Sequence, residues 1–186
     1  MKIRRIAYDA VLIAMMVALG YASVDLGTMK FTFENLPIII GAIMFGPVDG
    51  MIIGALGEFL AQILKYGIDA TTVLWIFPYV LSGLLVGFGA KLLAVRKCYM
   101  SGFKAESAKN IWRIIVLLIV NGIVVTLANT LSLYIAYKFV YFTPVEAMLL
   151  KLPMRIVTNI IKAVAFAIVV PMILYGLRKI PFGDKK

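Results

Sequence analysis

Apolar residues follow one another in six blocks along the chain, separated by gaps that are rich in charged residues, glycine or proline. The blocks cover residues 6–22, 36–45, 51–64, 72–95, 111–139 and 145–177. Most of them are apolar all round, and about 20 such residues are enough for a helix to cross a bilayer. The pattern predicts an all-α integral membrane protein with six transmembrane helices, forming a single domain over residues 1–186.

Composition supports a membrane protein. Of the 186 residues, 63% are hydrophobic and 15% are charged, against about 45–50% and about 25% in soluble domains. The mean hydropathy is +1.01. The first apolar block also continues beyond the roughly 7–15 residues of a signal-peptide core, so we interpret it as a retained first span.

Several kinds of chemistry are disfavoured by what the sequence lacks. It has no histidine, a single cysteine and no GxxxxGK[ST] phosphate-binding loop. These counts argue against a disulfide framework, a histidine-based metal or proton-relay site, and ATP hydrolysis by the chain itself. We therefore expect no enzyme activity, no metal and no cofactor. A small membrane enzyme remains a weak alternative.

The basic residues predict the orientation. Three lie in the N-terminal arm, six around the gap after the fourth block and four at the C-terminus, together thirteen of the 19 lysines and arginines. Six passes place these three regions on one side, which is cytoplasmic under the positive-inside rule. The same rule accounts for the net charge of +10, so we expect no nucleic-acid partner.

Two blocks are shorter than a full span: residues 36–45 number ten and residues 51–64 number fourteen. Irregular backbone at membrane depth is tolerated where it lines a cavity. We therefore predict that the loop over residues 23–35 covers a pocket at the outer ends of these helices. Plain hydrophobic mismatch with the bilayer is the alternative.

Polar residues inside four blocks recur at helical spacing, so each set occupies one face of its helix. They are Glu58, Gln62 and Lys65; Trp75, Tyr79 and Ser82; Asn121, Asn129 and Ser132; and Lys151, Arg155, Asn159 and Lys162. Ionisable groups in spans are costly and often mark function. Snorkelling lysines, an aromatic belt, interhelical hydrogen bonds or a Glu58–Arg155 ion pair would explain them without a ligand.

The charges of this predicted pocket favour an acidic ligand. Lys151 and Arg155, with Lys30, Lys65 and Lys162 as further candidates, outnumber Glu58, the only deep anion that the pattern indicates. Buried charges need partners, and arginine can hold a carboxylate through two hydrogen bonds. Glu58 could bind an amino-heterocycle on which aromatic rings stack. The expected substrate-binding residues are Lys30, Phe31, Glu58, Gln62, Trp75, Tyr79, Asn121, Asn129, Lys151, Arg155 and Asn159.

Small residues form further stripes. Ala10, Ala14, Ala18 and Ala22 recur every four residues, and glycines do so in Gly46-xxx-Gly50-xxx-Gly54 and Gly83-xxx-Gly87. Such stripes let two helix backbones approach closely. The partner helix could belong to this chain or to another protein.

The six blocks, the long first loop, the alanine stripe and the run FENLPIIIGAIMFGPVDGMIIGALGEFLAQIL resemble one family. It comprises the substrate-binding S components of energy-coupling factor (ECF) vitamin transporters. The resemblance implies the ECF S-component fold in the bacterial plasma membrane, with a vitamin bound near the outer side. It also implies that Ala10, Ala14 and Ala18 contact a transmembrane coupling (T) component, and that two partner ATPases hydrolyse the ATP.

The run KLPMRIVTNIIK is most similar to the last helix of the folate-specific branch, so the resemblance implies a folate-binding subunit. The fourth block opens with TTVLWIFPYVLSGLLVG, which departs from that branch. Pantothenate, biotin or another acidic vitamin therefore remain alternatives, as does a stand-alone secondary transporter.

Overall fold

The computed structural model describes residues 2–22, 24–25, 30–95, 107–140 and 152–177. Within these ranges the regular secondary structure is helical apart from one pair of short strands, and short turns connect the elements. The helices are α1 (Lys2–Tyr21), α2 (Asn35–Met44), α3 (Pro47–Tyr66), α4 (Thr72–Leu92), α6 (Ser107–Ile135) and α8 (Leu152–Leu177), and the π-helical turn η1 (Ala136–Val140) extends α6. Strands β1 (Val24–Asp25) and β2 (Lys30–Phe31) pair antiparallel, with Val24 opposite Phe31.

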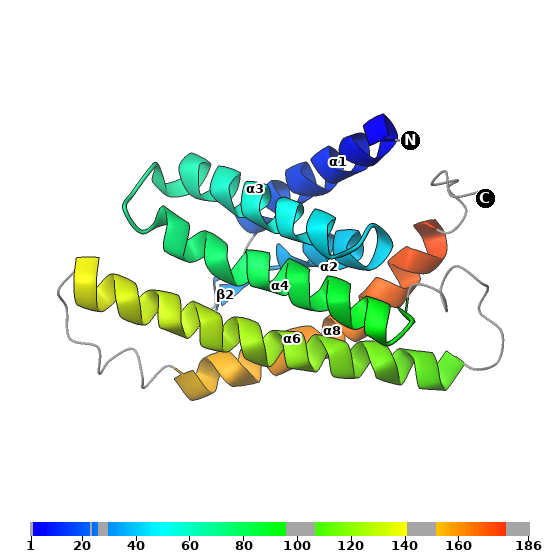
Figure 1. Ribbon diagram of the computed structural model, residues 1–186. Coiled ribbons are helices and arrows are strands. Elements are labelled where there is room, and N and C mark those ends of the chain that lie inside the picture. The colour runs from blue at the N-terminus through cyan, green and yellow to red at the C-terminus, as the bar shows by residue number, and fades with distance from the viewer. Residues whose placement is uncertain (1, 23, 26–29, 96–106, 141–151, 178–186) are drawn as a thin grey trace.

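The helices form one elongated bundle. In Figure 1, α3 runs beside α4, and α6 runs along α8; both pairs are in direct contact. The start of α1 and the end of α8 lie at the same end of the bundle. An even number of passes would give this arrangement, and the cytoplasmic location of that end stays a prediction.

Four helical segments among the described residues are long and apolar enough to cross a membrane. They are Pro47–Tyr66, Thr72–Leu92, Trp112–Val140 and Ile156–Leu174. α1 has 20 residues but carries four charged side chains in its first half, and α2 has only ten residues. The protein is thus a multi-pass membrane protein by this measure, and the crossing of all six helices stays a prediction.

The third helix is longer than its fourteen-residue apolar block predicts. α3 begins at Pro47, directly after the turn at Gly46, and extends for 20 residues. Proline suits the first helical position, where its missing N–H would have no partner, and Asp49 suits the positive end of the helix dipole. The prediction that this helix is too short to span is therefore wrong. The ten-residue length predicted for α2 is confirmed.

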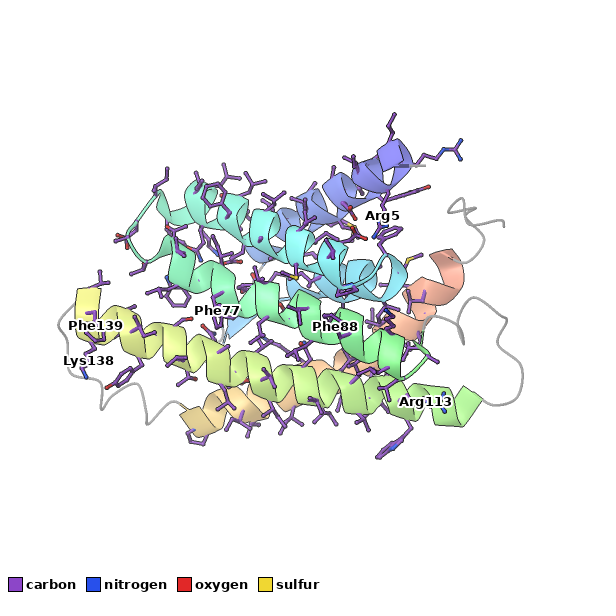
Figure 2. All side chains as sticks on the ribbon, in the orientation of Figure 1. Arg5, Phe77, Phe88, Arg113, Lys138 and Phe139 are labelled. Atoms are coloured by element: carbon purple, nitrogen blue, oxygen red, sulfur yellow. The ribbon has the colours of Figure 1, made fainter. Side chains whose placement is uncertain are left out.

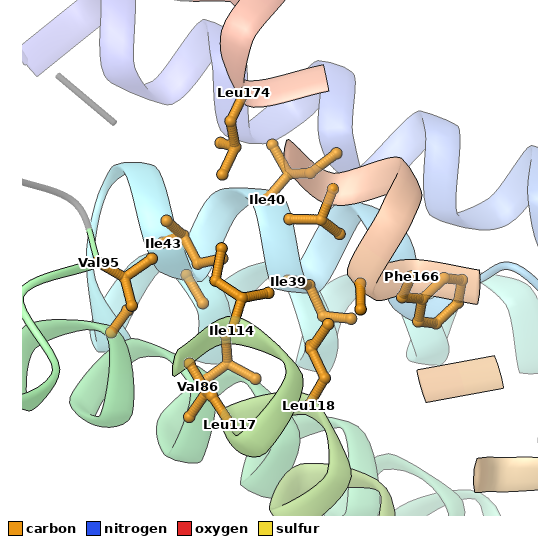
Figure 3. Close-up of a cluster of buried hydrophobic side chains, with 14 of the residues drawn as sticks. Ile39, Ile40, Ile43, Val86, Val95, Ile114, Leu117, Leu118, Phe166 and Leu174 are labelled. Atoms are coloured by element: carbon orange, nitrogen blue, oxygen red, sulfur yellow. The ribbon is translucent and has the colours of Figure 1, made fainter. Parts of the chain in front are cut away.

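The hydrophobic core lies between α2, α4, α6 and α8. Figure 3 shows Ile39 and Ile43 of α2 facing Val86 of α4, Ile114 of α6 and the helix that carries Phe166. Of these side chains, Val86 and Ile114 are fully buried. Because α2 is apolar all round and enclosed by the longer helices, it acts as the central support of the bundle.

The two glycine stripes pack against each other where α3 meets α4. A Cβ built on Gly83 would lie 2.3 Å from the carbonyl carbon of Gly50, and one built on Gly87 would lie 2.3 Å from Cα of Pro47. One built on Gly54 would lie 2.6 Å from the carbonyl oxygen of Tyr79. The glycine stripes therefore serve packing within the chain, and they place Tyr79 against α3.

A polar cluster ties the start of α1 to the turn between α2 and α3. Arg5, labelled in Figure 2, pairs with the carboxylate of Asp49 and donates a hydrogen bond to the carbonyl oxygen of Phe45 at 2.8 Å. The ring of Tyr8 stacks on Phe45 with centroids 6.0 Å apart. These contacts fix α1 alongside α3 and leave the alanine stripe on the outside, since Ala10, Ala14 and Ala18 are all exposed.

Candidate substrate-binding cavity

The short α2 creates room for a cavity. Ten helical residues rise about 15 Å from the turn at Gly46, whereas the 20 residues of α3 rise about 30 Å. Beside the C-terminal half of α3 there is consequently no helical α2 backbone. A cavity of about 600 Å³ occupies this end of the bundle. It is bordered by α1, α3, α4, α6 and α8 and by residues 32–35, which enter α2 and are called the covering segment below. It lies at the end opposite the start of α1.

The cavity brings together side chains from all four predicted polar faces. Six of the predicted substrate-binding residues line it: Glu58, Gln62, Trp75, Tyr79, Asn129 and Asn159. Lys65 and Lys162, which the charge pattern also indicated, line it as well. The predicted convergence of these helices on one pocket therefore agrees with the geometry.

Asn121 is not among the cavity-lining residues. It is buried between α4 and α6, where its Nδ2 donates to the hydroxyl of Ser82 at 3.1 Å. This contact corresponds to the interhelical hydrogen bond that the sequence left open as an alternative. Lys151 and the side chains of Lys30, Phe31 and Arg155 lie outside the described part of the structure.

Glu34, which the sequence analysis did not select, is central to the cavity wall. It precedes α2, and its Oε1 accepts hydrogen bonds from the Tyr79 hydroxyl at 2.5 Å and from Thr32 at 2.9 Å. The other carboxylate oxygen faces Gly20 of α1, because a Cβ built there would lie 3.4 Å from Oε2. Glu34 thus joins the covering segment to α1 and α4. The only sequence signal was an acidic residue beside the start of a very short helix.

The expectation that Glu58 is the only deep anion is wrong. Among the described side chains, the carboxylates of Glu34, Glu58 and Asp69 line the cavity, together with the amines of Lys65 and Lys162. Glu58 is 5% exposed, and its Oε1 accepts a hydrogen bond from Gln62 at 2.7 Å. This part of the lining can therefore accept hydrogen bonds from a donor-rich ligand as well as bind an acidic group.

Lys65 lies in the last turn of α3, a position from which a lysine of a membrane helix can snorkel to the interface. Its Nζ is 3.4 Å from the carbonyl oxygen of Gly20, and it lies 5.9 Å and 5.8 Å from the ring centroids of Tyr21 and Tyr66. These cation–π contacts hold a positive charge at the mouth of the cavity. Lys65 as a residue is exposed and lines the cavity, so its positive charge lies beside the space that a ligand would occupy.

A hydrogen-bonded chain links α6 and α8 in the opposite wall. Asn159 of α8 donates from Nδ2 to the hydroxyl of Thr126 at 2.5 Å, and that hydroxyl donates to the carbonyl oxygen of Gly122 at 2.6 Å. Thr126 is 4% exposed, and both Thr126 and Asn159 line the cavity. Sequence reasoning selected Asn159 but not its partner, because threonine is common in membrane helices and gives no pattern of its own.

Comparison with known proteins agrees with this architecture. A family model described as "ECF transporter, substrate-specific component" matches residues 4–174. In addition, 56 residues of the chain are 32% identical to UPF0397 proteins of two Clostridium perfringens strains. That second match spans 30% of this chain and 29% of each relative. Because the family model covers nearly the whole chain, we conclude that the protein belongs to the substrate-specific components of ECF transporters, a family of transport subunits and not of enzymes.

Proposed function

We propose that this chain binds folate in the cavity at the outer end of the bundle and delivers it inward when docked on partner subunits. The observation that carries the proposal is a cavity of about 600 Å³ with aromatic side chains beside two carboxylates. That volume falls within the roughly 300–1,000 Å³ typical of small-molecule sites. The chain itself would need no cofactor.

The acidic and aromatic part of the wall suits the pterin head of folate. A pterin carries an amino group next to a ring N–H, and a carboxylate can accept both hydrogen bonds together. Glu34 and Glu58 are two such carboxylates, and Trp75 and Tyr79 of α4 line the adjoining wall. Aromatic side chains stack favourably on flat rings of this kind.

The basic part of the cavity suits the glutamate tail. Lys65 and Lys162 are the cationic residues among the described lining. Arg155 precedes Asn159 by one helical turn on α8, so its Cα lies on the same helix face. A carboxylate of the acidic tail could form charge-assisted hydrogen bonds with these cationic groups.

Delivery into the cell would depend on the coupling subunit and the two ATPases of an ECF complex. Ala10, Ala14 and Ala18 form an exposed strip of small side chains on α1. Such a strip lets a partner helix approach closely. We propose this strip as the contact surface for the T component.

Folate binding is testable by thermal unfolding of the purified protein in detergent. A ligand at 100 times its Kd stabilises the native state by about 2.7 kcal/mol, and for a chain of this size this raises Tm by on the order of 5–10 °C. Pteroate and p-aminobenzoyl-glutamate, which each lack one end of folate, should give smaller shifts. A shift with pantothenate or biotin and none with folate would reassign the substrate.

Tyr79→Phe tests the hydrogen bond between Tyr79 and Glu34. Without the phenolic hydroxyl, the Glu34 carboxylate loses the hydrogen bond that holds it against α4. The covering segment, which contains Glu34, is then attached to α4 less firmly. We expect folate to dissociate about tenfold faster, since a hydrogen bond to a charged group contributes about 1.5–3 kcal/mol. Tyr8→Phe, at the other end of the bundle, removes the same atom and should leave the rate unchanged. Equal dissociation rates for wild type and Tyr79→Phe would exclude a role for this bond.

A further inference from the structure

The wall formed by α6 and α8 contains an amide whose orientation is determined by its neighbour. Asn159 offers a donor at Nδ2 and an acceptor at Oδ1, and exchanging the two ends changes what a ligand meets. The side chain is partly exposed and lines the cavity. Which of the two ends faces the ligand therefore affects which ligands can bind.

The hydroxyl of Thr126 decides this orientation because it has a single proton. Its oxygen lies 2.6 Å from the carbonyl oxygen of Gly122, one turn earlier in α6, and this carbonyl can only accept. Threonine hydroxyls in membrane helices commonly bond back to this carbonyl. The proton is thus used within α6, and the oxygen can only accept from Asn159. The Asn159 amide must then turn its NH₂ group to Thr126, at 2.5 Å.

The consequence is that the carbonyl end of Asn159 is the end available to the cavity. A second amide behaves in the same way, because Gln62 on α3 directs its Nε2 to Glu58 at 2.7 Å. The two amides therefore add acceptors beside Glu34 and Glu58. The lysine amines that also line the cavity differ in function, because they can only donate, whereas these four groups can accept. An acceptor-rich wall selects ligands that carry N–H or O–H donors, since a buried acceptor left unpaired by a ligand is costly.

We infer that Thr126 is a positioning residue, which fixes the Asn159 amide so that this wall accepts a hydrogen bond from the ligand. The inference rests on the proposed role of the cavity in substrate binding. Thr126 acts through Asn159, so its loss matters only while Asn159 is present. Valine has nearly the same shape as threonine but no hydroxyl, which makes Thr126→Val the informative substitution. Thr126→Ser keeps the hydroxyl and is its matched control.

The first experiment needs no ligand and measures hydrogen exchange of the Asn159 side-chain NH₂ by NMR in detergent. We expect exchange to be about fivefold faster in Thr126→Val than in wild type, as loss of one hydrogen bond predicts. Thr126→Ser should resemble wild type. Equal exchange in wild type and Thr126→Val would overturn the inference, whatever the substrate is.

The second experiment is a double-mutant cycle for folate affinity. Thr126→Val should weaken binding about three- to tenfold, Asn159→Leu should weaken it further, and the double variant should match Asn159→Leu alone. A purely structural role of Thr126 would give the same loss in both backgrounds, and this outcome would overturn the inference. If wild type binds no folate, the proposed substrate is wrong, and the exchange measurement still decides whether Thr126 orients Asn159.

Discussion

Ala14→Leu is expected to abolish vitamin uptake by cells while leaving the affinity of the isolated protein for its ligand unchanged. Ala14 is exposed in the middle of the α1 strip and does not line the cavity, which α1 borders only at its C-terminal end, at Gly20 and Tyr21. A leucine there adds three carbon atoms to a surface that a partner backbone would have to approach closely. Overpacking of this kind costs about 1–3 kcal/mol, which weakens association about five- to 150-fold.

Three measurements on each variant separate coupling from folding: ligand affinity in detergent, copurification with the T component, and uptake in cells. Ala14→Ser keeps the side chain small and should retain uptake. Val120→Phe adds bulk to an exposed position of α6 and should also retain it. If Ala14→Leu lowers Tm or ligand affinity of the isolated protein, the strip serves packing within the chain. If uptake persists, the strip does not contact the coupling subunit.

The approximate positions of the helices in the described part of the chain could be predicted from the sequence because membrane helices are apolar over nearly their whole length. The residues at which the helices begin and end were harder to predict. Pro47 and Asp49 lie in the gap between the second and third apolar blocks, although both favour the first turn of a helix. The deciding feature is Gly46, whose φ of 115° completes the turn by itself. A sequence pattern shows that a glycine is present but not which φ it adopts.

The candidate site could be predicted in part for a similar reason. Glu58 and Gln62 belong to a periodic polar face of one helix, and such a face is visible in the sequence. Glu34 belongs to no face, and its partner Tyr79 is 45 residues away. Its position depends on how far the short α2 raises the covering segment, which is a property of the packed bundle. The omission of Glu34 also explains why the pocket was expected to be so short of negative charge.

The glycine stripes were recognised from their spacing, but the sequence left open what they contact. In the structure each stripe is the other's partner, and α3 and α4 approach until backbone meets backbone at Gly50 and Gly83. This close approach places Tyr79 and Glu58 on adjoining walls of the cavity. Packing at the glycines and the shape of the site are therefore linked.

Gly83→Ala should consequently destabilise the protein, although alanine is the better helix former. The added Cβ would lie 2.3 Å from both the carbonyl carbon and oxygen of Gly50 and 2.7 Å from the nitrogen of Met51. These are backbone atoms of α3, so relief requires the two helices to separate. We expect a loss of about 1–3 kcal/mol, measured as a fall in Tm of several degrees, together with weaker ligand binding because the adjoining walls move apart.

Gly176→Ala in α8 is the matched control, because a Cβ built there meets nothing within 4 Å. The intrinsic preference of about 0.5–1 kcal/mol for alanine over glycine in a helix should leave that variant as stable as wild type or slightly more so. The same chemical change is thus expected to have opposite signs at the two positions. Equal Tm values for the two variants would mean that α3 and α4 are not in backbone contact. The placement of Tyr79 and Glu58 on adjoining walls of the cavity, which depends on that contact, would then be wrong.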